Sequence, residues 1–392
     1  MAHDTVRVLT FYIDPVAYRD RLLMLRAAAP AVGRIEVLLP HAPAALVAEL
    51  STPHFVLTPL AARPLPRWRR EPAIAQAVLS RVSRGEVDLV HDTASHLLAV
   101  FAALRLHPRR PRLLSSSFTA GYEWHEDLRR QFPYESAYYT RVRWTSFLQE
   151  RAICHLADAV TVFGEGHIPR VAHSHGVPLA RLHSLPNCCD PAVFRPCAPD
   201  PASTGFPPGT RVLTNVGNQF IYKGTWELLR AFAEVSRSHD DARLLLVGNI
   251  HDEEEAALRA EPARLGVADR VRFVGRCPRD LVPVLLSTSD AFVFPSYTEG
   301  SPRAVLEAMA CGLPVIATSL AGITALDPAA AFTRFVPRAD AGALAAALDA
   351  HLRASPEDRA RRAEAARARY LAHHTPDAAA RPLVALYRTL CP

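Results

Sequence analysis

The chain has 392 residues, of which 49% are hydrophobic, and this is enough for two or three domains with packed cores. Fibrous, disordered and small disulfide-stapled classes are therefore excluded. The seven cysteines include no Cys-x2-Cys pair, which argues against structural zinc and favours a reducing compartment. The chain opens on a strand-like apolar run at 6–13, and no apolar run reaches the ~18–20 residues of a spanning helix, so we expect a cytoplasmic protein.

The net charge of +6 comes from 45 basic residues against 39 acidic ones, and every basic residue except Lys223 is an arginine. A lysine retained in such a chain indicates either a site that needs a compact ammonium group or survival by chance. The excess of positive charge lies before residue 196. Its densest runs, 63–70 and 107–112, are broken by proline and poor in aromatic residues, which argues against nucleic-acid binding and leaves a solvated face or a peripheral membrane contact.

In chain order, the first half alternates short apolar runs with segments of helical period. The predicted helices cover 18–29, 94–106 and 135–156, and the predicted strands cover 6–13, 34–39, 88–91, 112–115 and 159–163. Strands that alternate with helices indicate parallel βαβ units with helices on both faces of the sheet.

A Pro-rich stretch at 197–210 interrupts this pattern and is predicted to be the interdomain linker. The pattern then restarts, and a largely helical tail begins at 341. We expect an α/β protein with two Rossmann-like, doubly wound domains, over 1–196 and 211–374, facing a central cleft. A C-terminal helix over 375–392 follows, and one hypothesis is that it packs back against the first domain. The predicted strands of the second half cover 211–216, 243–247, 271–274, 291–294 and 314–317.

The stretch 295–318 has the order loop, helix, strand. Ser301 suits the N-cap, Pro302 suits the first helical position, and Gly312 followed by Pro314 suits the helix end. Backbone N–H groups at Gly300 and Ser301 would then favour an anion such as a nucleotide phosphate.

Two glutamates distinguish this stretch. Glu299 lies in the loop, and Glu307 lies inside the apolar run Ala-Val-Leu-Glu-Ala-Met-Ala. A carboxylate in apolar surroundings is costly unless it has a hydrogen-bond partner. A ribose diol is one such partner, and a nearby backbone group or arginine is the other reading.

Glu299 and Glu307 form a Glu-x7-Glu spacing that resembles the donor site of the family 4 glycosyltransferases, which are retaining enzymes of the GT-B fold. The stretch 216–224, Val-Gly-Asn-Gln-Phe-Ile-Tyr-Lys-Gly, is similar to the phosphate loop of that family, and 185–196 is similar to its interdomain strand and turn. The resemblance covers about residues 157–318.

By this resemblance Lys223 contacts the donor diphosphate, Glu299 lies at the transferred sugar, and Glu307 binds the ribose hydroxyls. Lys223 and Glu299 are the residues assigned to catalysis. The resemblance implies a nucleotide sugar as substrate, with no cofactor and no catalytic metal. The remaining donor-binding positions are Gly217, Asn218, Gly300, Ser301 and Pro302.

The sequence departs from the family at Asn218, where the family has an arginine. One of two cations on the leaving diphosphate is then missing, and such a loss typically costs ~3 kcal/mol. Either another arginine substitutes or the enzyme is slow or inactive. The stretch 321–325 also lacks the glutamate of the family's last turn.

Acceptor binding is expected in the first domain. His91 and His96 are candidates for contact with the transferred sugar, with a structural role as the alternative. Tyr122, Trp124 and Glu126 lie in a Gly-containing stretch after a predicted strand, and aromatic faces with carboxylates suit a sugar, an aminocyclitol or a natural-product aglycone.

The sequence therefore predicts a retaining, metal-independent glycosyltransferase that acts on a small polar acceptor. A lipid-linked acceptor and a non-catalytic nucleotide-sugar binder are the alternatives. A GT-A transferase, a dehydrogenase and a serine hydrolase are disfavoured, because the sequence has no Asp-x-Asp pair, no G-x-G-x-x-G after the first strand and no G-x-S-x-G.

Overall fold

The structure is a computed structural model that describes residues 5–11, 19–93, 97–117, 137–252 and 254–392, with the backbone alone described at 67 and 137–144. The chain forms two compact units. We call them unit 1, made of Met1–Cys188 and Pro376–Pro392, and unit 2, made of Cys189–Thr375.

Unit 1 is built on a seven-stranded parallel sheet of order β3-β2-β1-β4-β5-β6-β7 within its described residues. Because all strands are parallel, their carboxyl ends meet at one edge of the sheet. The strands are β1 (Val6–Phe11), β2 (Gly33–Leu39), β3 (Phe55–Pro59), β4 (Leu89–Asp92), β5 (Arg112–Ser117), β6 (Ala159–Phe163) and β7 (Leu182–Leu185).

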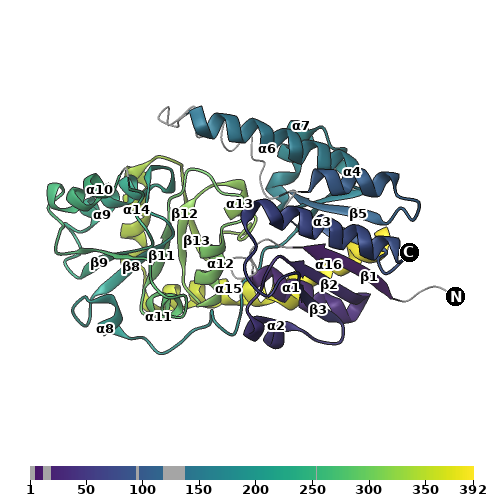
Figure 1. Cartoon of the computed structure of the whole chain (residues 1–392). Helices are drawn as coiled ribbons and strands as arrows, with labels where there is room; N and C mark the ends of the chain where they lie inside the picture. The colour runs from purple at the N-terminus through teal and green to yellow at the C-terminus, as the bar shows by residue number, and fades with distance from the viewer. Residues whose placement is uncertain (1–4, 12–18, 94–96, 118–136, 253) are drawn as a thin grey trace. The chain divides into compact units, whose positions relative to one another are not determined.

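Helices cover both faces of this sheet (Figure 1). Successive side chains of a strand point to opposite faces, and accordingly Val8 joins the core under α1, whereas Leu9 joins the core under α3 and α4. The helices of unit 1 are α1 (Arg19–Val32), α2 (Ala44–Leu50), α3 (Arg67–Ser83), α4 (Leu98–Leu106), α6 (Ala137–Leu156), α7 (Ile168–His175) and α16 (Pro376–Leu390), with 3₁₀ turns η1 (Glu165–His167) and η2 (Leu179–Arg181).

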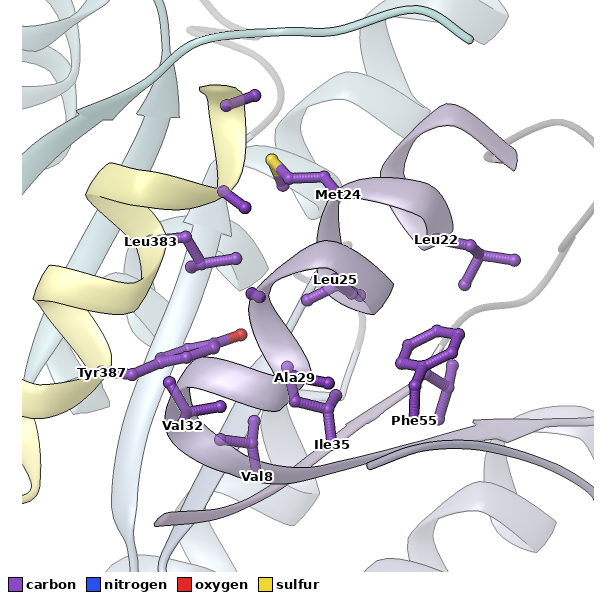
Figure 2. Packing of buried hydrophobic residues seen from close by; sticks show 14 of the residues in the cluster. Val8, Leu22, Met24, Leu25, Ala29, Val32, Ile35, Phe55, Leu383 and Tyr387 are labelled. Carbon is purple, nitrogen blue, oxygen red and sulfur yellow. The ribbon is translucent and has the colours of Figure 1, made fainter. Parts of the chain in front are cut away.

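The last helix of the chain, α16, belongs to unit 1 and packs against its first helix, α1. Leu383 and Tyr387 of α16 join the same buried cluster as Leu25 and Val32 of α1 and Val8 of β1 (Figure 2). Unit 1 therefore closes its core with a segment that follows unit 2 in the sequence.

Unit 2 repeats this plan, and the part of it that the structure describes has a six-stranded parallel sheet of order β10-β9-β8-β11-β12-β13. Cores lie on both of its faces, one under α9 and α14 and the other under α12 and α15. The strands are β8 (Arg211–Val216), β9 (Ala242–Val247), β10 (Val271–Gly275), β11 (Ala291–Phe294), β12 (Val315–Thr318) and β13 (Thr333–Val336). The helices are α8 (Pro201–Thr204), α9 (Thr225–Val235), α10 (Glu255–Arg264), α11 (Leu281–Ser287), α12 (Arg303–Ala310), α13 (Ala321–Thr324), α14 (Ala341–Leu352) and α15 (Pro356–His373), with a 3₁₀ turn η3 (Ile221–Lys223).

The chain passes from unit 1 to unit 2 between Cys188 and Cys189, ahead of the segment 197–210 that the sequence predicts as the linker. That segment is held on unit 2. The Asp200 N–H donates to Thr288 Oγ1 (2.9 Å), and Arg272 donates to the Thr204 carbonyl (2.6 Å). Prolines lower the entropy that an ordered segment loses on folding, so a Pro-rich composition suits an anchored connection as well as a linker.

Among the described residues, the structure has no helix that combines the length and the apolar character needed to cross a membrane.

Candidate functional site

The centre of the candidate site is the connection from β11 to α12. The helix begins at Arg303, and Pro302 holds the N-cap position. Ser301, which the sequence predicts as the N-cap, is therefore the residue before the N-cap. Proline carries no side-chain oxygen that can accept from the first-turn N–H groups, which leaves this helix end suited to an external acceptor. The helix stops at Cys311 and Gly312, whose φ of +76° favours glycine, as the sequence predicts.

Two glycines allow the loops of this site to approach one another closely. A Cβ atom at Gly224 would lie 2.1 Å from the Pro295 carbonyl oxygen, and one at Gly322 would lie 2.1 Å from the Gly300 carbonyl oxygen. Gly224 therefore permits contact between the η3 turn and the segment after β11. Gly322 does the same between α13 and the loop that carries Glu299, a role that the sequence did not reveal.

Lys223 and Glu299 form an ion pair at the carboxyl ends of β8 and β11. The Lys223 ammonium donates to Glu299 Oε1, and Ser296 Oγ donates to the same oxygen at 3.0 Å. The Tyr297 N–H also donates to the Tyr222 carbonyl (2.8 Å) and joins the two loops through their backbones. The lone lysine of the chain and the loop glutamate are thus in direct contact. Both side chains are partly exposed, Lys223 at 24% and Glu299 at 13%.

The turn after β8 has Gly217 with φ of +151° and an exposed Asn218. The next residue, Gln219, is buried and fixes the turn, because its amide Nε2 donates to the Gly217 carbonyl (2.8 Å) and to Asn215 Oδ1 (2.8 Å). Glu254 supports the following residues by accepting from the Ile221 N–H (3.1 Å). Several hydrogen bonds therefore hold this loop, and Asn218 contributes no positive charge to it.

Glu307 lines a pocket of about 570 Å³ in unit 2. Its carboxylate is half-buried on α12, where the sequence places it inside an apolar run. The pocket holds three arginines in addition to this one carboxylate, and Arg279 lies over the Phe194 ring with its guanidinium carbon 5.2 Å from the centroid. The lining residues are Phe194, Arg276, Cys277, Pro278, Arg279, Val282, Arg303 and Glu307.

Sequence reasoning did not find the pocket arginines. Arg276 and Arg279 follow β10, and Arg303 begins α12, but in a chain whose basic residues are almost all arginine no single one stands out. The signal that was available is position. Residues that follow the carboxyl end of a parallel strand are those an open α/β sheet offers to a ligand.

His91, predicted to contact the sugar, has a different place. It is 2% exposed at the end of β4, with Nδ1 2.7 Å from Tyr387 Oη and Nε2 2.8 Å from Ser116 Oγ. Burial lowers the pKa of this imidazole to about 3, so it is neutral at physiological pH. In this structure His91 joins α16 to the sheet of unit 1, which is the structural role that the sequence analysis gives beside sugar contact.

The other predicted acceptor residues, His96, Tyr122, Trp124 and Glu126, lie outside the described residues. Of the basic run at 63–70, the structure shows Trp68 70% exposed, with the Arg69 guanidinium carbon 4.6 Å from the centre of its ring. A membrane contact at this surface remains a prediction.

The whole chain is similar to solved structures with two Rossmann-like domains. A sucrose-phosphate synthase from Thermosynechococcus elongatus aligns over 98% of this chain and 99% of its own, with a TM-score of 0.76 and 24% identity. The Anabaena protein HepE, in complex with UDP and glucose, aligns over 98% of this chain and 100% of its own, with a TM-score of 0.72 and 18% identity. The chain has the GT-B fold.

Within this GT-B chain, residues 198–369 match the family model described as glycosyl transferases group 1. The match includes Lys223, Glu299, Glu307 and the pocket arginines, and it lies entirely in unit 2.

Curated relatives match over shorter stretches. A D-inositol 3-phosphate glycosyltransferase from Segniliparus rotundus is 33% identical over 36% of this chain and 33% of its own length. A 2-deoxystreptamine N-acetyl-D-glucosaminyltransferase from Streptomyces fradiae is 34% identical over 36% of this chain and 34% of its own. The chain thus spans about a third of the length of these relatives.

Proposed function

We propose that this chain is a retaining glycosyltransferase that binds a nucleotide-sugar donor in unit 2 and transfers its sugar to a small polar acceptor bound by unit 1. The observation that carries the proposal is the Lys223–Glu299 pair beside a helix whose Glu307 lines an open pocket, all within the segment similar to group 1 glycosyltransferases. The UDP and glucose held by the similar Anabaena protein support a nucleotide-sugar donor.

Each residue of the pair has a distinct part in this reaction. In the absence of donor the Lys223 ammonium is held by Glu299, and on binding it turns to the diphosphate, whose negative charge grows as the sugar leaves. The released Glu299 carboxylate accepts from hydroxyl groups of the sugar. Glu307 accepts hydrogen bonds from the ribose hydroxyls at the wall of the pocket that it lines.

Retention follows when the acceptor hydroxyl enters on the face from which the diphosphate departs. A phosphate oxygen of the leaving group then takes the acceptor proton, so no protein base is required. The pocket and the ion pair serve this course by holding the diphosphate in place during transfer.

The acceptor is a polar ring such as a sugar, an aminocyclitol or a natural-product aglycone. Two relatives are named for cyclitol acceptors, inositol 3-phosphate and 2-deoxystreptamine, which supports this class. The aromatic and acidic residues of 118–127, outside the described residues, are the expected contacts.

The test is a calorimetric and hydrolysis screen of UDP-, GDP-, ADP- and dTDP-sugars. One donor should bind and be hydrolysed slowly, and Lys223→Ala and Glu307→Ala should each weaken binding at least ~10-fold, because a charged hydrogen-bond partner contributes ~1.5–3 kcal/mol. Arg259→Ala is the control, since Arg259 is an exposed residue of α10 paired with Glu255. Unchanged titrations for both site variants contradict the assignment.

The same screen separates a second candidate, a nucleotide-sugar binder without turnover. The observation that favours it is the exposed Asn218 where the family carries an arginine. Tight donor binding with no hydrolysis, and no transfer to any cyclitol or sugar acceptor, identifies the binder. Transfer only to a detergent-solubilised lipid identifies a lipid-linked acceptor.

A further inference from the structure

The diphosphate of the proposed donor needs more positive charge than the Lys223 loop supplies. Lys223 is matched by Glu299 in an ion pair, and Asn218 is neutral. The two side chains of the pair thus bring no net charge to the site, whereas each phosphate group of a nucleoside diphosphate is anionic. A site that binds such a ligand gains affinity from an excess of cations close to it.

That excess lies in the pocket of unit 2, where three arginines face one carboxylate. Arg276 and Arg279 come from the segment after β10, and Arg279 is stacked against Phe194. Arg303 comes from α12, the helix that also carries Glu307. Of the three, only Arg303 shares an element with the residue assigned to the ribose.

Arg303 and Glu307 are four residues apart on α12, so their side chains lie on one face, and both line the pocket. The rise of 1.5 Å per residue separates their positions by about 6 Å along the helix axis. This separation is comparable with the span from the hydroxyls of a ribose to its 5′-phosphate.

The order along the chain gives the direction. Glu307 is the ribose end of the proposed site, and Glu299 with its partner Lys223 is the sugar and diphosphate end. Arg303 lies between Glu299 and Glu307 in sequence, at the first position of the helix. A nucleotide that runs from one glutamate to the other therefore passes the Arg303 guanidinium at its first phosphate.

A cation at this position is unusual for a helix. The amino-terminal end of a helix carries partial positive charge, so an arginine in the first turn is disfavoured by ~0.3–1 kcal/mol, a cost that the Glu307 carboxylate four residues on and a bound phosphate can each offset. A phosphate beside Arg303 would turn this unfavourable charge interaction into a favourable one. The guanidinium would add planar, paired hydrogen bonds that an ammonium group cannot form.

We propose that Arg303 binds the first phosphate of the donor and supplies the cation that Asn218 does not. The proposal rests on the proposed function, because it names a further ligand of the same donor site. It makes Arg303 a determinant of diphosphate affinity that leaves nucleoside affinity unaffected, in contrast to Glu307.

The experiment measures binding of nucleoside, monophosphate and diphosphate by calorimetry, in the uridine, guanosine and adenosine series, to the whole chain. For the series that binds, Arg303→Ala should weaken the monophosphate and the diphosphate at least 10-fold and change the nucleoside less than 2-fold. Arg303→Lys should lie between the wild type and Arg303→Ala. Glu307→Ala should weaken all three ligands.

Arg276→Ala is the matched control, because it removes the same charge from the wall of the same pocket. Its effect on the diphosphate should stay below 3-fold. Arg303 is exposed, so its replacement leaves the core intact, and an unchanged melting temperature will show that the variant is folded.

Three results overturn the inference. Equal losses for nucleoside and diphosphate would place Arg303 on the base or the ribose. Equal losses for Arg276→Ala and Arg303→Ala would mean that only the total charge of the pocket matters. Unaltered diphosphate binding in Arg303→Ala would exclude the contact. If the wild-type chain binds none of the nucleotides, it is the proposed function that fails, and the inference falls with it.

Discussion

The two units share the order of their first four strands, but they pack one set of polar residues at the carboxyl ends of those strands differently. Both sheets place their first strand between the second and the fourth, in the orders β3-β2-β1-β4 and β10-β9-β8-β11. In unit 2 the carboxyl ends carry Lys223 and Glu299, both partly exposed. In unit 1 the end of β4 carries His91, which is buried and hydrogen-bonded. The fold therefore sets where a residue sits in a sheet, and the packing of neighbouring elements decides whether a ligand can reach it.

The buried side of this comparison is most sensitive at Tyr387. Its ring is fully buried in the core of unit 1 (Figure 2). Its hydroxyl contacts His91 Nδ1. Tyr387→Ala should lower the free energy of unfolding by about 3–5 kcal/mol, as for other large aromatic side chains. Tyr387→Phe, which removes the hydroxyl alone, should cost about 1–3 kcal/mol. Urea unfolding measures both, and equal costs would show that the ring contributes little beyond its hydroxyl.

The exposed side is tested by Glu299→Gln, which keeps the shape of the side chain and removes its charge. Turnover should fall by ~100-fold or more, equivalent to ~2.7 kcal/mol, because a polar group at the reacting sugar is altered. Binding of the bare nucleoside diphosphate should hold or tighten, since Lys223 loses its carboxylate partner. Steady-state kinetics and calorimetry give the two values. Parallel losses in both would place Glu299 on the nucleotide instead.

The smallest effect concerns acid stability. Burial lowers the pKa of His91 to about 3, whereas an unfolded histidine titrates near ~6.5. The unfolded chain therefore binds more protons below about pH 6.5, and His91 should reduce the free energy of unfolding by about 1.4 kcal/mol for each unit that the pH falls. We expect His91→Gln to reduce the slope of the free energy of unfolding against pH between pH ~6.5 and ~5, as measured by urea unfolding at each pH.

His351 provides the matched control in unit 2. Burial lowers its pKa to about 4, so it should contribute a similar slope over the same range. His351→Gln should remove that contribution and leave the contribution of His91 in place. If neither substitution changes the loss of unfolding free energy at low pH, carboxylates alone cause that loss.

Much of the fold could be predicted because long periodic segments and parallel strands leave plain patterns. The tail is an example: the sequence predicts it as largely helical from 341, and the structure places α14, α15 and α16 there, the last two beginning at Pro356 and Pro376. The sequence analysis did not predict the strands β3, β7 and β13. Phe55–Pro59 contains a proline, and Leu182–Leu185 and Thr333–Val336 are four residues long and half polar, so each resembles a loop.

The site divides in the same way. Lys223 and Glu307 stood out in the sequence because each is chemically unusual in its surroundings. In the structure Lys223 forms an ion pair with Glu299, and Glu307 lines the pocket of unit 2. The sequence left His91 with two possible roles, sugar contact and a structural role, because its contact with Tyr387 joins residues 296 positions apart in the chain. No local pattern carries such information.

The placement of α16 has a consequence for how the protein is made. Leu383 and Tyr387 complete the core of unit 1, but they follow unit 2 in the chain. During synthesis, β1 to β7 emerge first and wait with an open apolar face while all of unit 2 is translated. Unit 2 has every segment of its own sheet before that point. The unit that begins the chain is therefore the last to complete, and its unfinished core is the surface that chaperones would meet on the ribosome.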